Sequence, residues 1–182
     1  RAKDPLFEAD AYFALGQTEM DLKNYKQSLV YLEQALKVYT DFKDLLWESD
    51  VLKIVGENLI LQNRPDEALK YLLRCIELAK ENGFQLTEAI AYNMLGNAYS
   101  ALSRNSEALQ NLHKSIEVYD QMENPTEINK AYTSLGIFYN KLNQPKNALP
   151  YFEKAIKISD SIGAIPQASE AYFHRSQSFQ EL

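Results

Sequence analysis

The sequence predicts an all-α solenoid, a fold in which helix-turn-helix units stack side by side along one axis. The first observation behind this prediction is a glycine that recurs every 40 residues, at Gly16, Gly56, Gly96 and Gly136. The second is that a Leu or Val precedes each glycine, and a Tyr or Leu lies four residues before it. Periods of about 20–50 residues are typical of stacked-repeat proteins. Such proteins present an extended surface and more often hold a partner than transform a substrate.

The repeat divides the chain into four full units and one partial unit. The units run over 9–48, 49–88, 89–128 and 129–168, and 169–182 opens the fifth. Each full unit is expected to contain two helices, because apolar residues recur three and four positions apart on both sides of a polar turn. We expect one elongated domain over 1–182, since each unit of a solenoid contacts mainly its neighbours.

The first helix of each unit is expected to run for about 14 residues from the start of the unit. In the fourth unit its apolar positions are Tyr132, Leu135, Tyr139 and Leu142. Polar turns follow at 23–24, 63–65, 103–105 and 143–145. Pro65 and Pro145 in these turns suit the first turn of the next helix, because an N–H group would have no partner there.

The second helix of each unit carries small residues at two positions. These positions hold Ser28, Ala68, Ala108 and Ala148, and then Ala35, Cys75, Ser115 and Ala155. Together with the glycines they let two helix axes approach closely. Cys75, the only cysteine, therefore has the position of a core residue rather than of a nucleophile. We expect helix ends near Gly83 and Gly163, and another near Asn124 and Pro125, because glycine and asparagine tolerate the left-handed conformation.

One unit combines all of these features. The fourth unit carries Tyr132, Leu135, Gly136, Tyr139, Ala148, Phe152 and Ala155. This pattern resembles the tetratricopeptide repeat family, and the resemblance extends from about Asp10 to Leu182. The unit of 40 residues exceeds the usual length of about 34, and is similar to the repeats of bacterial signalling proteins, kinesin light chains and polarity scaffolds. The resemblance implies a right-handed α-solenoid whose first helices line a concave groove.

Composition argues against several classes of function. The net charge of −6 disfavours a general nucleic-acid or anionic-membrane surface, because both need a positive face. No run of about 18 apolar residues occurs, so we expect no membrane insertion. The two histidines, His113 and His174, lie in different units, and we expect both to be solvated. We expect no catalytic site, no metal site, no cofactor and no enzyme activity in this segment, because no phosphate loop or converging set of reactive side chains occurs.

The candidate partner-binding residues follow from the register and from the resemblance. In that family the ligand meets positions one residue after the aromatic and one residue after the glycine of the first helices. The first series is Phe13, Lys53, Asn93, Thr133 and Phe173, the second is Gln17, Glu57, Asn97, Ile137 and Gln177, and Asn140 lies one turn further. Amides can satisfy the backbone of a protein or peptide segment, and apolar positions can accept its side chains. The alternative is a soluble inner surface without a ligand.

The fifth unit departs from the pattern, because Arg175 and Ser176 replace the Leu-Gly pair. Terminal repeats often differ, since one side faces solvent. However, Tyr172, Phe173 and Phe179 would leave an apolar patch at this end. We expect a partner helix of a longer parent chain to cover it, or a second copy in a homodimer through 169–182.

The chain starts at Arg1 without Met and stops part-way through a repeat, so we expect it to be a piece of a longer protein. We expect a non-catalytic module that binds a protein or peptide, as the sensory or regulatory interaction domain of a larger bacterial signalling protein. A passive assembly scaffold is the alternative, and an accessory domain of an enzyme is a third interpretation. The cytoplasm is favoured as its location, with the periplasm left open.

Overall fold

The computed structural model describes residues 4–122, 125–163 and 165–180. Within these residues the chain forms nine α-helices and no strand. The helices are α1 (Pro5–Asp21), α2 (Tyr25–Phe42), α3 (Leu45–Leu61), α4 (Pro65–Asn82), α5 (Gln85–Ala101), α6 (Asn105–Gln121), α7 (Pro125–Lys141), α8 (Pro145–Ile162) and α9 (Ile165–Gln180). The predicted all-α class is therefore confirmed.

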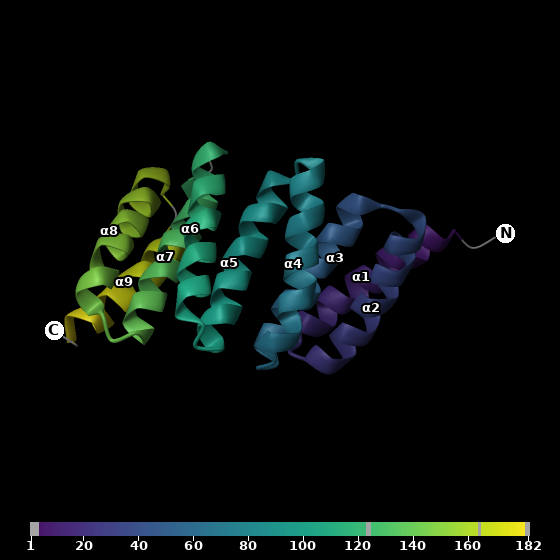
Figure 1. The fold of residues 1–182 in the computed structure, drawn as a ribbon, viewed down its shortest axis with the longest axis horizontal. Helices are drawn as coiled ribbons and strands as arrows, with labels where there is room; N and C mark the ends of the chain where they lie inside the picture. Colours follow the sequence, from purple (N-terminus) through teal and green to yellow (C-terminus); the bar gives the residue numbers. More distant parts are fainter. Residues whose placement is uncertain (1–3, 123–124, 164, 181–182) are drawn as a thin grey trace.

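The helices stack in chain order into one elongated row, and the two chain ends lie at opposite ends of the molecule (Figure 1). Each helix packs mainly against the helix before it and the helix after it. The odd-numbered helices, which are the first helices of the units, also contact their nearest odd-numbered neighbours. This nearest-neighbour packing is the solenoid that the 40-residue period predicts.

Glycine allows the two helices of a unit to approach closely. A Cβ atom added at Gly56 on α3 would lie 2.5 Å from Cδ2 of Leu72 on α4. A Cβ atom added at Gly136 on α7 would lie 2.5 Å from the ring of Phe152 on α8. Separations this short do not occur between unbonded carbon atoms, so the second helix occupies the space that a side chain would need. The recurring glycines therefore lie at four equivalent helix crossings, one in each full unit.

The first helices begin four residues before the predicted starts of their units. Helix α3, for example, begins at Leu45 rather than at residue 49. Its start is set by Asp44, whose carboxylate accepts a hydrogen bond from the backbone N–H of Trp47 at 3.3 Å. Such N-caps satisfy the free N–H groups of the first turn. The apolar period does not register a polar cap, which explains the early starts of α1 and α3; α5 begins equally early, after Phe84, without a side-chain cap.

Two of the predicted helix ends are confirmed. Gly83 ends α4 and Gly163 ends α8, with φ angles of 73° and 67° in the left-handed region. Helix α2 ends instead at Lys43, which adopts φ 57° without being glycine. Pro125 is the first residue of α7, and the predicted stop at Asn124 lies outside the described residues.

The core lies between the two layers of helices. Its fully buried large side chains include Leu32, Leu59, Leu72, Leu95, Leu112, Leu135 and Phe152. Cys75 is also fully buried, as predicted, and its thiol donates a hydrogen bond to the carbonyl oxygen of Ser49 at 3.2 Å. The equivalent Ser115 donates to the carbonyl oxygen of Ala89 at 2.8 Å. The small position of the second helix is thus a packing site in both units.

The expectation that both histidines are solvated is met only in part, because each is half-buried. His174 on α9 stacks on Phe152 of α8, with ring centroids 6.0 Å apart. Its Nδ1 atom lies 3.0 Å from Oε1 of Gln177. His174 therefore helps to attach α9 to the preceding unit, a role that its polar position in the repeat did not indicate.

Candidate functional site

The odd-numbered helices form a continuous surface along the stack, which we call the first-helix face. Successive odd-numbered helices contact one another, whereas the even-numbered helices make no such contacts among the described residues. Helices on the inner side of a curved stack lie closer together than those on the outer side. The first-helix face is therefore the inner side, where one ligand can contact several repeats at once.

All of the candidate residues lie on helices of this face. Gln17, Phe173 and Gln177 are exposed, whereas Phe13, Lys53, Glu57, Asn93, Asn97, Ile137 and Asn140 are half-buried. Thr133 is buried, with 3% of its surface exposed. The candidates on α3, α5 and α7 are therefore partly shielded from water, and those on α9 are open.

An amide cluster joins α5 to α7 on the first-helix face. The side-chain N–H of Asn97 donates to Oδ1 of Asn93 at 3.2 Å, and the hydroxyl of Ser134 donates to the same oxygen at 3.2 Å. Thr133 lies next to Ser134 on α7. We call Asn93, Asn97, Thr133 and Ser134 the amide cluster; three of them are predicted site residues, and Thr133 is included for its place beside Ser134 rather than for a contact. Ser134 was not among the candidates, because contact with the preceding first helix leaves no trace in the apolar period.

The amide cluster contains unpaired polar atoms. Among the described residues, the buried side-chain atoms without a hydrogen-bond partner are Nδ2 of Asn93 and Oγ1 of Thr133. An unsatisfied buried polar group costs about 1–3 kcal/mol, so native proteins contain few of them. Both atoms belong to residues that the register had placed in the binding face. The cluster therefore holds one amide N–H group and one hydroxyl that no other protein group satisfies.

A second polar group lies on α3. The ammonium of Lys53 pairs with Oδ1 of Asp50 at 2.7 Å, and the hydroxyl of Thr87 on α5 donates to the same oxygen at 3.3 Å. Glu57 lies one helical turn beyond Lys53 and makes no hydrogen bond among the described residues. Burial raises the pKa of the Glu57 carboxyl, and the charge of Lys53 opposes this effect only in part. The α3 segment thus carries an incompletely compensated carboxylate.

At the α7–α9 end of the first-helix face, Asn140 is engaged in hydrogen bonds within the protein. The hydroxyl of Ser178 donates to Oδ1 of Asn140 at 2.8 Å, and Nδ2 of Asn140 donates to the carbonyl oxygen of His174 at 3.4 Å. Phe173 and Phe179 of α9 are 59% and 55% exposed. Asn140 therefore holds the last helix in place, while the aromatic side chains of α9 remain at the surface.

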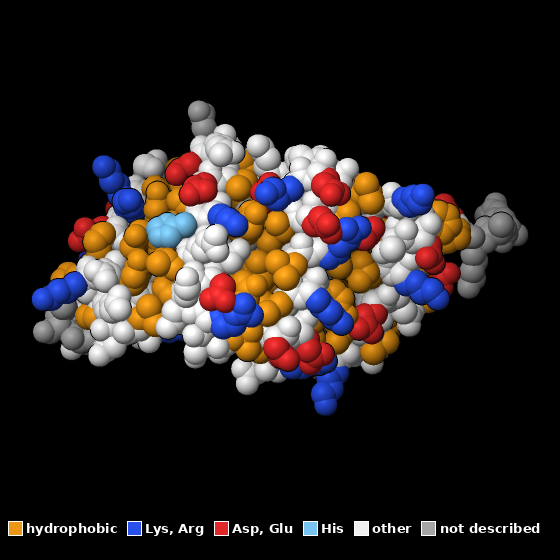
Figure 2. All heavy atoms as spheres, viewed as in Figure 1, with side chains coloured by type: hydrophobic (Ala, Val, Ile, Leu, Met, Phe, Trp, Pro, Cys, Tyr) orange, Lys and Arg blue, Asp and Glu red, His pale blue; other side chains and the backbone are white. Residues whose placement is uncertain are grey.

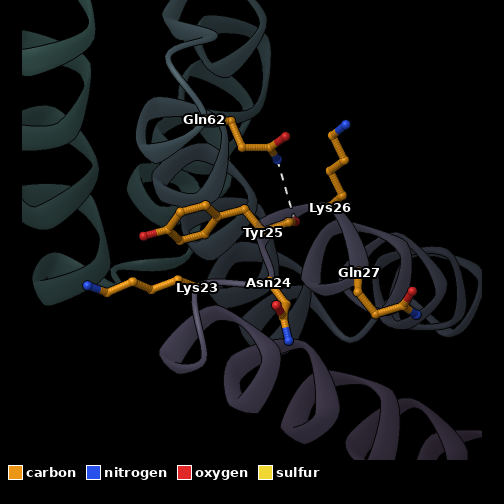
Figure 3. A pocket seen from close by; sticks show the side chains of 6 residues that line it. All are labelled: Lys23, Asn24, Tyr25, Lys26, Gln27 and Gln62. Carbon is orange, nitrogen blue, oxygen red and sulfur yellow. Dashed lines mark hydrogen bonds between the residues drawn. The ribbon is translucent and has the colours of Figure 1, made fainter.

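Two cavities lie away from the amide cluster. A cavity of about 590 Å³ is lined by Lys23, Asn24, Tyr25, Lys26, Gln27 and Gln62. Figure 3 shows that these side chains splay around the turn between α1 and α2, with Nε2 of Gln62 reaching the carbonyl oxygen of Tyr25 at 3.5 Å. A cavity of about 360 Å³ is lined by Tyr139, Lys146, Asn147, Pro150, Tyr151 and Lys154. Both are bordered largely by exposed side chains, and neither contains a buried unpaired polar group.

The described residues give little indication of a metal site or of a reactive nucleophile. No group of three or more His, Cys, Asp or Glu side chains there could hold a metal ion. Burial raises the pKa of the Cys75 thiol to about 12, which suppresses the thiolate that a nucleophile requires. None of the described helices is long and apolar enough to cross a membrane. On the face in view, Lys and Arg side chains alternate with Asp and Glu without an extended field of one sign (Figure 2).

The sequence model of the tetratricopeptide repeat matches residues 7–81, 54–121 and 87–161. These overlapping matches cover most of the chain, and the chain therefore belongs to the tetratricopeptide repeat family. A comparison with curated protein sequences gives no significant match.

Solved structures share the fold at low sequence identity. Aspartyl phosphate phosphatase F from Bacillus subtilis is 17% identical with a TM-score of 0.88, over 97% of this chain and 46% of that chain. A STAND signal-transduction ATPase with a tetratricopeptide repeat sensor, from Pyrococcus horikoshii, is 19% identical with a TM-score of 0.83, over 97% and 28%. A Rap protein complexed with competence and sporulation factor is 18% identical with a TM-score of 0.79, over 98% and 56%. The chain thus spans between 28% and 56% of the length of these proteins.

Proposed function

We propose that the chain is a non-catalytic module that binds an extended protein or peptide segment along its first-helix face. The observation that carries this proposal is the pair of unpaired buried atoms in the amide cluster, Nδ2 of Asn93 and Oγ1 of Thr133. A peptide backbone presents a carbonyl oxygen and an N–H group at almost every residue. It can therefore pair with an amide donor and a hydroxyl at once, and relieve the cost of leaving both unsatisfied.

The surroundings of the cluster suit a peptide better than a small charged ligand. Ile137 offers an apolar contact on α7 beside the cluster, and Phe13 is a half-buried aromatic two repeats further along the first-helix face, on α1. Main-chain hydrogen bonds combined with pockets for side chains are a general mode of peptide recognition. The inner curve of a solenoid also lets one extended segment contact several units.

A sensory or regulatory role is our proposal for the protein of which this module forms part. The support is the shared fold with a Rap protein complexed with competence and sporulation factor and with the sensor of a signal-transduction ATPase. Residues 1–182 would then act as one binding unit of a longer chain.

The test is selection of peptides by the immobilised protein from a library of random 12-residue peptides displayed on phage. A double variant, Asn93→Ala with Asn97→Ala, removes the side chains at the centre of the cluster. It should bind the selected peptides at least about 10-fold more weakly, because it loses hydrogen bonds made only in the complex. Its helical circular-dichroism signal should stay unchanged.

The matched control carries Gln34→Ala and Gln110→Ala, two exposed amides on the second helices α2 and α6. This control should bind the peptides as the unmodified protein does. Equal affinity of both double variants would contradict the proposal, since the amide cluster would then play no part in binding.

A further inference from the structure

We propose that the segment bound on the first-helix face carries a cationic side chain, lysine or arginine, and that Glu57 on α3 receives it. This inference rests on the proposed function and adds the chemistry of the ligand. It assigns to the α3 part of the face a recognition site that is separate from the amide cluster on α5 and α7.

Glu57 differs in charge from its counterparts in the repeat. Glu57 follows the glycine of the second unit, and the same position holds Gln17, Asn97 and Ile137 in the other full units. Glu57 is therefore the only charged residue at this position among the four full units. Asn97 of the amide cluster occupies the equivalent place on α5, the next helix of the face, which packs against α3. An extended ligand that runs from Asn97 toward the N-terminal end of the stack would therefore pass Glu57 on α3.

The charges next to Glu57 on α3 do not balance. Lys53 is the nearest cation on the same helix, but its ammonium pairs with Asp50 at 2.7 Å. Asp50 also accepts a hydrogen bond from Thr87, which holds it in this place. One positive and two negative charges on Lys53, Asp50 and Glu57 leave the segment with a net charge of −1. Glu57 is the member that has no hydrogen bond among the described residues.

The half-buried carboxylate of Glu57 has a free-energy cost in the unbound protein. Glu57 is half-buried, so water solvates its carboxylate only in part. A partly buried charge without a hydrogen-bonded partner destabilises a fold. Such departures from good pairing are expected where a ligand supplies the missing partner. The raised pKa of Glu57 agrees with the incomplete solvation seen in its contacts.

An ammonium or guanidinium group suits Glu57 better than a metal ion does. A divalent metal would need further anionic ligands, and the described residues contain no such group. An ammonium or guanidinium group needs one carboxylate and neighbouring amide oxygens to accept its remaining N–H groups. Glu57 supplies the carboxylate, and Gln17 and Asn97 carry amides at the same repeat position on the neighbouring first helices α1 and α5. A positive side chain is also attracted by a protein with a net charge of −6.

The experiment uses the same library of random 12-residue peptides with three forms of the protein: unmodified, Glu57→Gln and Glu57→Lys. The unmodified protein should enrich Lys or Arg at one position of the selected peptides. Glu57→Gln should still select peptides, since the amide cluster is intact, but without this preference. Glu57→Lys should favour Asp or Glu at the same position. Glu117→Gln, a neutralised carboxylate at an exposed site on α6, is the control and should keep the basic preference.

One enriched peptide then gives a quantitative test by calorimetry. Replacing its basic residue by Ala should weaken binding to the unmodified protein about 10-fold and leave binding to Glu57→Gln nearly unchanged. Acetylating the amino terminus of the peptide separates a side-chain cation from a terminal amine. Loss of affinity on acetylation alone would contradict the assignment of a side chain.

The outcomes distinguish this inference from the proposed function. If the unmodified protein selects peptides that lack a basic position, or if Glu57→Gln keeps the basic preference, the inference is wrong while peptide binding stands. If the unmodified protein selects no peptides, both are wrong. A thermal unfolding curve of each variant checks that the variant is folded under the conditions of the binding experiment.

Discussion

Single polar residues hold neighbouring helices in register within the core. Nδ2 of Asn58 on α3 donates to the hydroxyl of Ser28 on α2 at 2.9 Å, and Nδ2 of Asn129 on α7 donates to the hydroxyl of Ser159 on α8 at 2.6 Å. These pairs satisfy groups that would otherwise be costly to bury. The paired amides of the core contrast with Asn93 on the first-helix face, whose Nδ2 atom has no partner. We propose that this difference separates residues that stabilise the fold from residues that bind a ligand.

At the same scale, the charge of Glu57 should lower the stability of the free protein. Burial raises the pKa of the folded-state carboxyl, so the folded state favours its protonated form. The favourable contribution is present at low pH and is lost as the pH rises through the folded pKa. Glu57→Gln should therefore raise Tm at pH 7 by about 1–2 °C, a small gain because the carboxylate is partly solvated.

The difference in Tm between Glu57→Gln and the unmodified protein should shrink as the pH falls toward about 4, where the carboxyl protonates in both states. Circular-dichroism melting curves at the two pH values provide the measurement. A lower Tm for the variant at pH 7 would show that Glu57 stabilises the fold, and would remove one support for a recognition role.

At the scale of elements, the unit of construction is a pair of helices in contact at a glycine. Helices α3 and α4 approach so closely that the Cβ of an alanine at Gly56 would overlap the side chain of Leu72. The glycine costs about 1 kcal/mol in helix propensity relative to alanine. The close packing of the pair compensates for this cost.

Gly56→Ala should therefore destabilise the protein by about 1–3 kcal/mol, because overpacking outweighs the gain in helix propensity. Leu72→Ala alone should cost about 2–5 kcal/mol through the cavity that it leaves. In the Leu72→Ala background the new methyl group has room, so Gly56→Ala should cost much less there. Urea unfolding of the four proteins measures this coupling. Strictly additive effects would show that the two positions do not meet.

At the scale of the whole molecule, the repeat period was sufficient to predict the stacking of the helices. The glycine crossings, the burial of Cys75 and the ends at Gly83 and Gly163 all follow from residues that recur in the sequence. The helix starts were harder to predict, because α1 and α3 begin at polar caps, Asp4 and Asp44, that the apolar pattern does not include, and α5 begins without a side-chain cap. Apolar periodicity shows which face of a helix is buried. It does not show at which residue the helix begins.

The first-helix face was predictable only as a set of positions. The register placed Asn93 and Thr133 correctly on odd-numbered helices, but it could not show that Nδ2 of Asn93 and Oγ1 of Thr133 lack partners. That property depends on the rotamers of side chains on two helices that are about 40 residues apart in the sequence. The register also could not show that Asn140 accepts a hydrogen bond from Ser178.

The most direct test of the account is a ¹H–¹⁵N NMR titration of the labelled protein with one peptide selected from the library. Binding along the first-helix face predicts that the side-chain amide signals of Asn93 and Asn97 shift on addition of the peptide. The amides of Asn105 and Asn147, which lie on the second helices, should stay in place. Shifts confined to residues 23–27 and Gln62, or to α9, would contradict the account, because the peptide would then bind away from the amide cluster.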